Sequence, residues 1–194
     1  EIDVISDRSR EISSTLKPIK QDRDFPSYSW RVRHGDVMHY SKHHHCDVLF
    51  MGDSITHHFG GPILDYRGAG IPVWDRRYGK LRFQNMGFGW DRLENLQYRI
   101  YTGALDFIKP KVIVLMIGTN NLAHNNEKEI IDGIKYITYL IHKRSPDTHI
   151  LLMSILPRKN MFAKGMADLT KVNGYFNSIR QKNLTFVNLT KHFM

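Results

Sequence analysis

Cysteine is nearly absent from this chain, and long apolar runs are absent altogether. The single cysteine, Cys46, excludes a disulfide within the chain, and its place at the start of an apolar run favours a buried, inert thiol. No apolar run approaches the ~20 residues of a membrane-spanning helix, so we expect no transmembrane segment. Internal repeats and low-complexity tracts are also lacking. The 194 residues are therefore expected to form one globular domain with a substantial core.

Basic residues outnumber acidic ones. The chain has 28 Lys and Arg against 19 Asp and Glu, which gives a net charge of +9. Such an excess attracts anionic partners, among them phospholipid surfaces, nucleic acids and acidic glycans. The basic residues are scattered, however, without a Lys/Arg block or a regular alternation with aromatic residues, and we expect no nucleic-acid partner. Three consecutive histidines at 43–45 have no matching Cys, His or Asp cluster elsewhere, so we expect no metal and no other cofactor.

Five short apolar runs alternate with helical patterns along the chain. The runs cover residues 46–51, 81–86, 111–117, 149–156 and 184–189. The clearest helix is predicted over 127–144, where isoleucines recur at helical spacing, and others over about 29–44, 91–102 and 166–182. The alternation predicts an α/β fold, a three-layer α/β/α sandwich with a five-stranded parallel sheet, flavodoxin-like in strand order. Residues 1–28 are polar and are expected to form an irregular arm.

Small and hydrogen-bonding residues stand where these apolar runs end. "GDSIT" follows the first run, "NMGFGWDR" the second, "IGTNNL" the third and "LPRKN" the fourth. Ligands of open parallel sheets bind outside the carboxyl ends of the strands, which makes these turns the candidate site. The first strand delivers Ser54 to that edge, at the start of a further helix whose outward N–H groups favour negative charge. Such a place is suited to hold a developing oxyanion.

The segments "GDSIT", "NMGFGWD" and "GTNN" resemble, in order and spacing, the first three sequence blocks of the SGNH/GDSL hydrolases. "ILPR" and "VNGYFNSI" are similar to the branch that contains platelet-activating-factor acetylhydrolase subunits and bacterial acetyl esterases. The resemblance covers roughly residues 30–190. It implies an SGNH hydrolase domain over 29–194 and a serine esterase that cleaves short-chain esters, acetyl esters foremost, through an acyl-enzyme. The substrate would be a small-molecule or glycan ester.

The same resemblance assigns the catalytic groups. Ser54 is the expected nucleophile, and its own N–H joins the oxyanion hole together with the side-chain amide of Asn120. The second block, at Gly89 and Trp90, is expected to add one backbone N–H. Many members carry glycine where this chain has Trp90, and a glycine-only backbone conformation would be strained for Trp. The indole either lines the acyl pocket or packs against the arm.

Three further residues are placed on the substrate side of the site. Asp53 is expected to shape the nucleophile turn and not to serve as the triad acid. Asp91 closes the second block and is expected near the substrate. Arg158 follows the fourth strand, where it either contacts an anionic group of the substrate or is simply solvated.

The family's general base is missing from its expected place in this sequence. The resemblance implies an Asp-x-x-His motif after the fifth strand, and none follows that strand here; the one in the sequence, Asp36–His39, precedes the first strand. His57 shares a helical turn with Ser54, and His192 has no Asp three residues before it, so neither is expected to replace the base. Either the chain is incomplete and lacks this segment and the last helix, or it ends here without the standard base.

We favour an incomplete chain, and the first residue, Glu1, also indicates a processed or trimmed product. The main rival to an esterase is a catalytically incomplete protein of the same fold that binds an acylated glycan or a protein partner.

Overall fold

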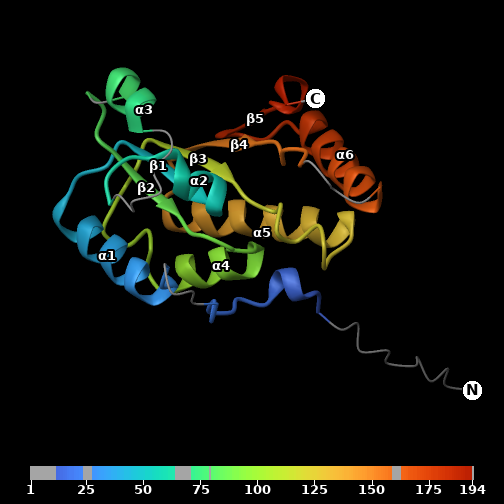
Figure 1. Cartoon of the computed structure of the whole chain (residues 1–194), viewed down its shortest axis with the longest axis horizontal. Coiled ribbons are helices and arrows are strands. Elements are labelled where there is room, and N and C mark those ends of the chain that lie inside the picture. Colours follow the sequence, from blue (N-terminus) through green and yellow to red (C-terminus); the bar gives the residue numbers. More distant parts are fainter. Residues whose placement is uncertain (1–11, 24–27, 64–70, 79, 159–162, 194) are drawn as a thin grey trace, which may run out of the picture.

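A five-stranded parallel sheet forms the centre of the protein (Figure 1). The structure is a computed structural model that describes residues 12–23, 28–63, 71–78, 80–158 and 163–193. The strands lie in the order β2-β1-β3-β4-β5 and all pairs are parallel. Their bounds are β1 Val48–Gly52, β2 Phe83–Gly87, β3 Val112–Met116, β4 His149–Met153 and β5 Leu184–Val187. This confirms the predicted α/β fold and its strand order.

The α-helices of the described residues lie between successive strands, except the first, which precedes β1. They are α1 Trp30–His43, α2 Ser54–Phe59, α3 Ile71–Tyr78, α4 Leu93–Tyr101, α5 Glu127–Arg144 and α6 Ala163–Ser178, with short 3-10 helices η1 Ser14–Leu16 and η2 Thr190–His192. The helix predicted over 127–144 coincides with α5. The predicted ends of α1, α4 and α6 differ from the observed ones by one to four residues. The sequence did not predict α3. Of the predicted arm, residues 1–11 and 24–27 lie outside the described residues.

Helix α5 has the cap, the buried face and the end that its sequence pattern predicts. Asn126 caps its start by accepting from the Glu129 N–H at 3.0 Å, and Glu129 Oε2 accepts from the Asn126 N–H at 2.9 Å. The isoleucines of one face are buried against the sheet: Ile130, Ile134, Ile137 and Ile141. The helix ends at Arg144, before the Ser145-Pro146 pair that disfavours a helix.

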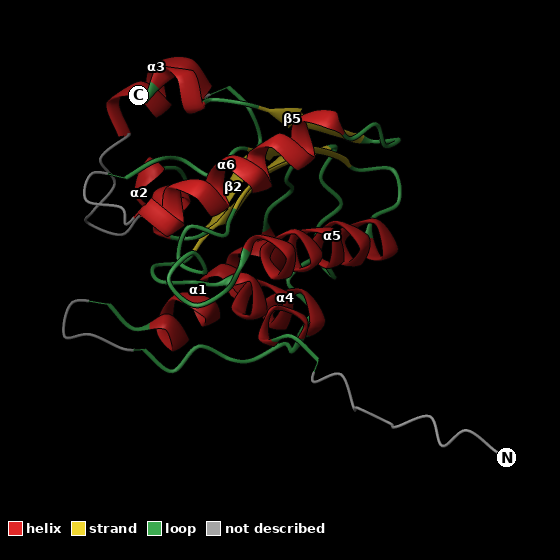
Figure 2. Cartoon of the chain, turned by 90° about the vertical axis from the view of Figure 1, so that its right-hand side faces the viewer, coloured by secondary structure: helices red, strands yellow, loops and turns green. Residues whose placement is uncertain are grey.

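Most of the core lies on one face of the sheet. The strands bury alternate apolar residues there: Leu49, Met51, Ile113, Leu115, Ile150 and Leu152. Figures 1 and 2 show α1, α4 and α5 together on this side of the sheet, with α2 on the other. Helix α6 joins the same core, because the ring of its Phe176 lies 6.3 Å from that of Phe186, the register partner of Leu152.

The second face is covered less completely. Helix α2 packs on β1 and β2, and its Phe59 ring lies 5.7 Å from the Phe50 ring. Further along this face, β3 and β4 present apolar side chains that are only partly buried: Val112, Val114, Met116, Leu151 and Met153. No helix among the described residues is long and apolar enough to cross a membrane.

The register of the sheet aligns the ends of three strands. Gly52 of β1 pairs with Gly87 of β2 on one side and with Met116 of β3 on the other. The chain therefore leaves β1, β2 and β3 at the same edge, within a strand spacing of about 5 Å on either side. The segments that contain Ser54, Trp90 and Asn120 start from this common edge.

The core face predicts how substitutions in α5 affect stability. Ile137→Ala is expected to lower the free energy of unfolding by about 2–5 kcal/mol, because Ile137 is fully buried and its truncation leaves a cavity. Tyr139→Ala, on the exposed side of the same helix, is expected to lower it by less than about 1 kcal/mol. Urea unfolding of both variants tests this, and equal losses would contradict the assignment of the buried face.

Candidate active site

The nucleophile turn, residues Gly52–Ser54, joins β1 to α2. Asp53 is the N-cap of α2 and its Oδ1 accepts from the Ile55 N–H at 2.9 Å, which makes the half-buried Ser54 the first helical residue. A Cβ at Gly87 would lie 2.1 Å from the His57 nitrogen. Only glycine at that position lets the first turn of α2 lie directly on β2, and this contact fixes the helix that begins with Ser54.

The Asp53 carboxyl is almost entirely buried beneath Ser54. Its exposed fraction is 1%, and among the described residues its Oδ2 has no hydrogen-bond partner. Burial, followed by the negative charge of Asp91, raises the pKa of Asp53 to about 7, against the opposing effects of the Ile55 N–H and the positive charge of Arg158. The charges of Asp91 and Arg158 therefore both act on the Asp53 carboxyl at the strand ends.

The second turn, Phe88–Asp91, is called the oxyanion turn below. The Asp91 N–H donates to the Phe88 carbonyl at 3.2 Å, and the Phe88 N–H donates to the Gly52 carbonyl at 3.0 Å. Trp90 occupies the third position with φ +65°, in the left-handed region where turns of this kind favour Gly or Asn. The strain expected from the sequence is therefore present. Trp90 is 51% exposed, so it stands at the rim of the site.

The third turn brings Asn120 to the oxyanion turn. Gly118, two residues after the end of β3, has φ +116°, and the Asn121 N–H donates to its carbonyl at 3.0 Å. Asn120 Nδ2 donates to the Asp91 carbonyl at 2.9 Å. This bond uses one of the two amide hydrogens of Asn120, so the second can donate to another acceptor. Two of the three sequence-predicted oxyanion elements are thus in direct contact.

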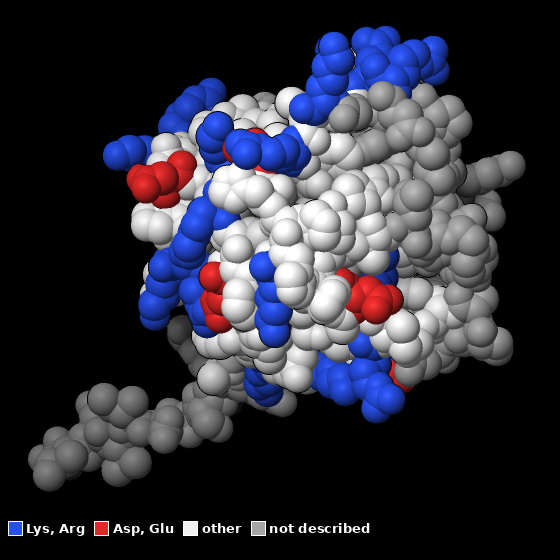
Figure 3. Space-filling model, turned by 90° about the vertical axis from the view of Figure 1, so that its left-hand side faces the viewer, with Lys and Arg blue, Asp and Glu red and all other residues white. Residues whose placement is uncertain are grey.

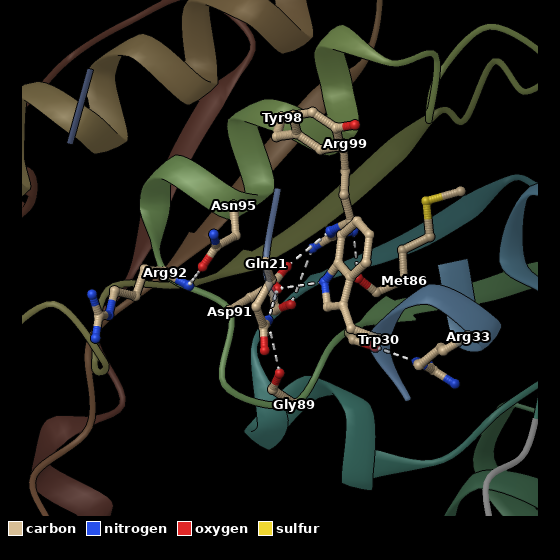
Figure 4. A network of polar contacts seen from close by, with 12 residues as sticks. Gln21, Trp30, Arg33, Met86, Gly89, Asp91, Arg92, Asn95, Tyr98 and Arg99 are labelled. Atoms are coloured by element: carbon tan, nitrogen blue, oxygen red, sulfur yellow. Dashed lines mark hydrogen bonds and ion pairs between the residues drawn. The ribbon is translucent and has the colours of Figure 1, made fainter. Parts of the chain in front are cut away.

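Asp91 is the centre of a fully buried network (Figure 4). Its Oδ1 accepts from Gln21 Nε2 at 2.5 Å and from Trp30 Nε1 at 2.9 Å, and its Oδ2 accepts from Arg99 Nε at 2.9 Å. With no exposed surface and with its carboxylate oxygens bonded to protein groups, the side chain of Asp91 is buried beneath the backbone of the oxyanion turn. We therefore revise its expected contact with substrate to a role in holding this turn.

Arg99 connects the same network to both strands. Its Nη1 donates to the Met86 carbonyl at 3.1 Å and its Nη2 to the Gly52 carbonyl at 3.3 Å. The sequence reasoning did not identify Arg99. A signal was available, because Arg99 follows Leu96 by three residues and precedes Ile100, on the face of α4 that helical periodicity predicts to be buried.

The remaining candidates lie around this edge. Arg158 is exposed, shortly after β4. His57 is buried, with its ring 5.4 Å from that of Tyr28, and His192 is exposed in η2. Among the described residues no group of three or more His, Cys, Asp and Glu could hold a metal ion. Figure 3 shows Lys and Arg in several separate groups on one side of the molecule, with Asp and Glu between them.

Comparison with known proteins agrees with this arrangement. A family model described as the GDSL-like lipase/acylhydrolase family matches residues 50–194, which include all three turns. This chain belongs to the GDSL-like lipase/acylhydrolase family. The resemblance seen in the three sequence blocks is thereby confirmed.

Relatives of this family member include subunits of a mammalian enzyme. Over 129 residues it is 34% identical to platelet-activating factor acetylhydrolase IB subunit alpha2 from Homo sapiens, covering 66% of this chain and 52% of that protein. Over 129 residues it is 30% identical to subunit alpha1 from Bos taurus, covering 66% of this chain and 51% of that protein. The chain thus spans about half the length of the curated relatives it matches.

A solved structure shares the fold. A carbohydrate esterase family 3 from Talaromyces cellulolyticus superposes with a TM-score of 0.55 at 16% identity, covering 75% of this chain and 79% of that one. This likeness supports the fold of the acylhydrolase domain.

The strained turn predicts an unusual ranking of two substitutions. Trp90→Gly is expected to be more stable than Trp90→Ala, with a free energy of unfolding about 0.5–1.5 kcal/mol higher, because glycine adopts the left-handed φ without strain and alanine does not. Both variants lose the indole, so their comparison isolates the backbone. Equal stabilities in urea unfolding would contradict the strain.

The buried carboxyl of Asp53 predicts a pH dependence. Its folded pKa of about 7 lies above the usual unfolded value, so its contribution to stability is present below about pH 4 and disappears as the pH rises through 7. Asparagine caps a helix without a charge. Relative to wild type, Asp53→Asn should therefore gain roughly 2–4 kcal/mol between pH 4 and pH 8, measured by urea unfolding at each pH.

Asp47 provides the control for this series. Its pKa is lowered, chiefly by the hydrogen bond from Arg82, so the effect of Asp47→Asn should change with pH in the opposite direction. A gain for Asp53→Asn that does not vary with pH would show that Asp53 ionises normally in the folded protein.

Proposed function

We propose that this protein is a serine esterase that hydrolyses short-chain esters, acetyl esters foremost, with Ser54 as the nucleophile. The observation that carries the proposal is the bond of 2.9 Å between Asn120 Nδ2 and the Asp91 carbonyl, at the strand-end edge from which the Ser54 turn also starts. It joins the side-chain donor to the turn that supplies the backbone donor. Acetyl esters are favoured because the matched relatives are named acetylhydrolases.

The reaction proceeds by acyl transfer. Ser54 Oγ attacks the ester carbonyl and gives its proton to a base, forming a tetrahedral intermediate. The oxyanion accepts hydrogen bonds from the N–H groups of Ser54 and Trp90 and from Asn120 Nδ2. The alcohol leaves with a proton, and water then releases the acyl group from Ser54 by the reverse sequence of proton transfers. The buried carboxyl groups of Asp53 and Asp91 hold, through their hydrogen bonds, the turns that carry these donors.

We propose that the base comes from a segment outside residues 1–194, as the resemblance to the family implies. The Asp-x-x-His pattern occurs in the sequence only at Asp36–His39, on α1 before the first strand, and the buried His57 belongs to the same short helix as Ser54. Arg158 is proposed to meet an anionic part of the substrate, since it is exposed near the site.

The nucleophile is tested by substitution. Ser54→Ala is expected to reduce turnover of p-nitrophenyl acetate to the rate without protein, because the acyl acceptor is lost. Asn120→Ala is expected to lower kcat by about 100-fold or more while a residual rate remains. Ser178→Ala, an exposed serine on α6, serves as the control.

Turnover that persists unchanged in Ser54→Ala would remove Ser54 from the mechanism. No turnover in wild type, together with saturable binding of an acetylated glycan, would favour the rival function of a catalytically incomplete binding protein.

A further inference from the structure

An N-terminal segment that precedes the family match reaches the oxyanion turn. The arm segment, defined as the described residues 12–23, lies before residues 50–194, which the family model covers. Its helix η1 packs against α4 and α5. The Ile19 N–H donates to the Glu94 carbonyl at 3.1 Å, and Asn95 Nδ2 donates to the Ile19 carbonyl at 2.9 Å. The arm segment is therefore attached to the start of α4, directly after the oxyanion turn.

Gln21 extends this attachment into the turn itself. The side chain is 3% exposed, and its Nε2 donates to the Gly89 carbonyl at 3.1 Å and to Asp91 Oδ1 at 2.5 Å. Figure 4 shows Gln21 beside Asp91 with a bond to Gly89. These acceptors belong to the residues on either side of Trp90. A single amide thus spans the residue that holds the left-handed φ.

This bridge acts on a backbone that would otherwise relax. A Trp residue at φ +65° is disfavoured, so the turn keeps that conformation only where its surroundings impose it. Loss of the bridge frees the Gly89 carbonyl and one acceptor site of Asp91 and weakens the restraint on the Trp90 N–H. An oxyanion donor acts fully only when it is aligned before the reaction, and small misplacements lower rates steeply.

We propose that Gln21 is a positioning residue for ester cleavage, which makes the N-terminal arm segment part of the active site. It holds the peptides around Trp90 so that the N–H of the oxyanion turn stays directed at the reacting carbonyl. The catalytic consequence rests on the proposed function, whereas the restraint on the turn does not.

Gln97 offers a matched control within the same arm attachment. It is also a buried glutamine, and its Nε2 donates to the Thr15 carbonyl at 2.6 Å and to the Gly133 carbonyl at 3.5 Å. It therefore fastens the arm segment to α4 and α5, as Gln21 fastens it to the oxyanion turn. Methionine replaces either glutamine with similar volume and without hydrogen bonds.

The experiment compares Gln21→Met, Gln97→Met and wild type, each in protein that includes the proposed base segment. It measures kcat and KM for p-nitrophenyl acetate and amide hydrogen exchange in peptides spanning residues 87–92. Gln21→Met is expected to lower kcat about tenfold or more with little change in KM, and to speed exchange in 87–92 by about tenfold. Gln97→Met is expected to keep the wild-type kcat and the wild-type exchange in 87–92, with a lower melting temperature.

Equal kcat and equal exchange in the two variants would overturn the proposal, because Gln21 would then act only on overall stability. If the wild-type chain shows no turnover that depends on Ser54, the proposed function fails. Hydrogen exchange alone then decides whether Gln21 restrains the oxyanion turn. Faster exchange in 87–92 of Gln21→Met only would then support the restraint, and unchanged exchange would overturn it.

Discussion

The buried ion pair between Asp91 and Arg99 is the constraint on which the rest of the site depends. Both side chains are at most 1% exposed, with 2.9 Å between the paired atoms, and an isolated charge at that depth would be strongly unfavourable. The pair is satisfied only if the ends of β1 and β2 are in place, because Arg99 also donates to the carbonyls of Met86 and Gly52. The fold and the geometry of the turns are thus established together.

This constraint explains how a strained turn persists at the strand ends beside Ser54. Trp90 lies between Gly89, whose carbonyl accepts from Gln21, and Asp91, whose carboxylate and carbonyl are both bonded. The surrounding bonds impose the left-handed conformation and leave the half-exposed indole at the rim. Strain of this kind is typical of functional sites, where a rigid surrounding holds a donor in a direction that a relaxed chain would not keep.

Sequence reasoning recovered what local patterns encode. Apolar runs and the small residues that end them predicted the five strands, the turns at Ser54 and Asn120 and the capped helix α5. It missed the partners of Asp91, since Gln21 and Trp30 lie 70 and 61 residues away along the chain. An acidic residue in a turn predicts exposure, and only the assembled fold reveals a buried carboxylate. Helix α3 was missed because its 8 residues, "IPVWDRRY", are too short a window to establish a helical period.

The central claim is that Ser54 accepts an acyl group at a prearranged oxyanion hole, and trapping that group tests it most directly. Protein that includes the proposed base segment would be mixed with p-nitrophenyl acetate, quenched in acid, digested and analysed by peptide mass spectrometry. The account predicts one acetyl group on Ser54, formed faster than acetylation of any lysine and reduced in Asn120→Ala. Acetylation confined to surface lysines, with Ser54 unmodified while ester is consumed, would contradict it.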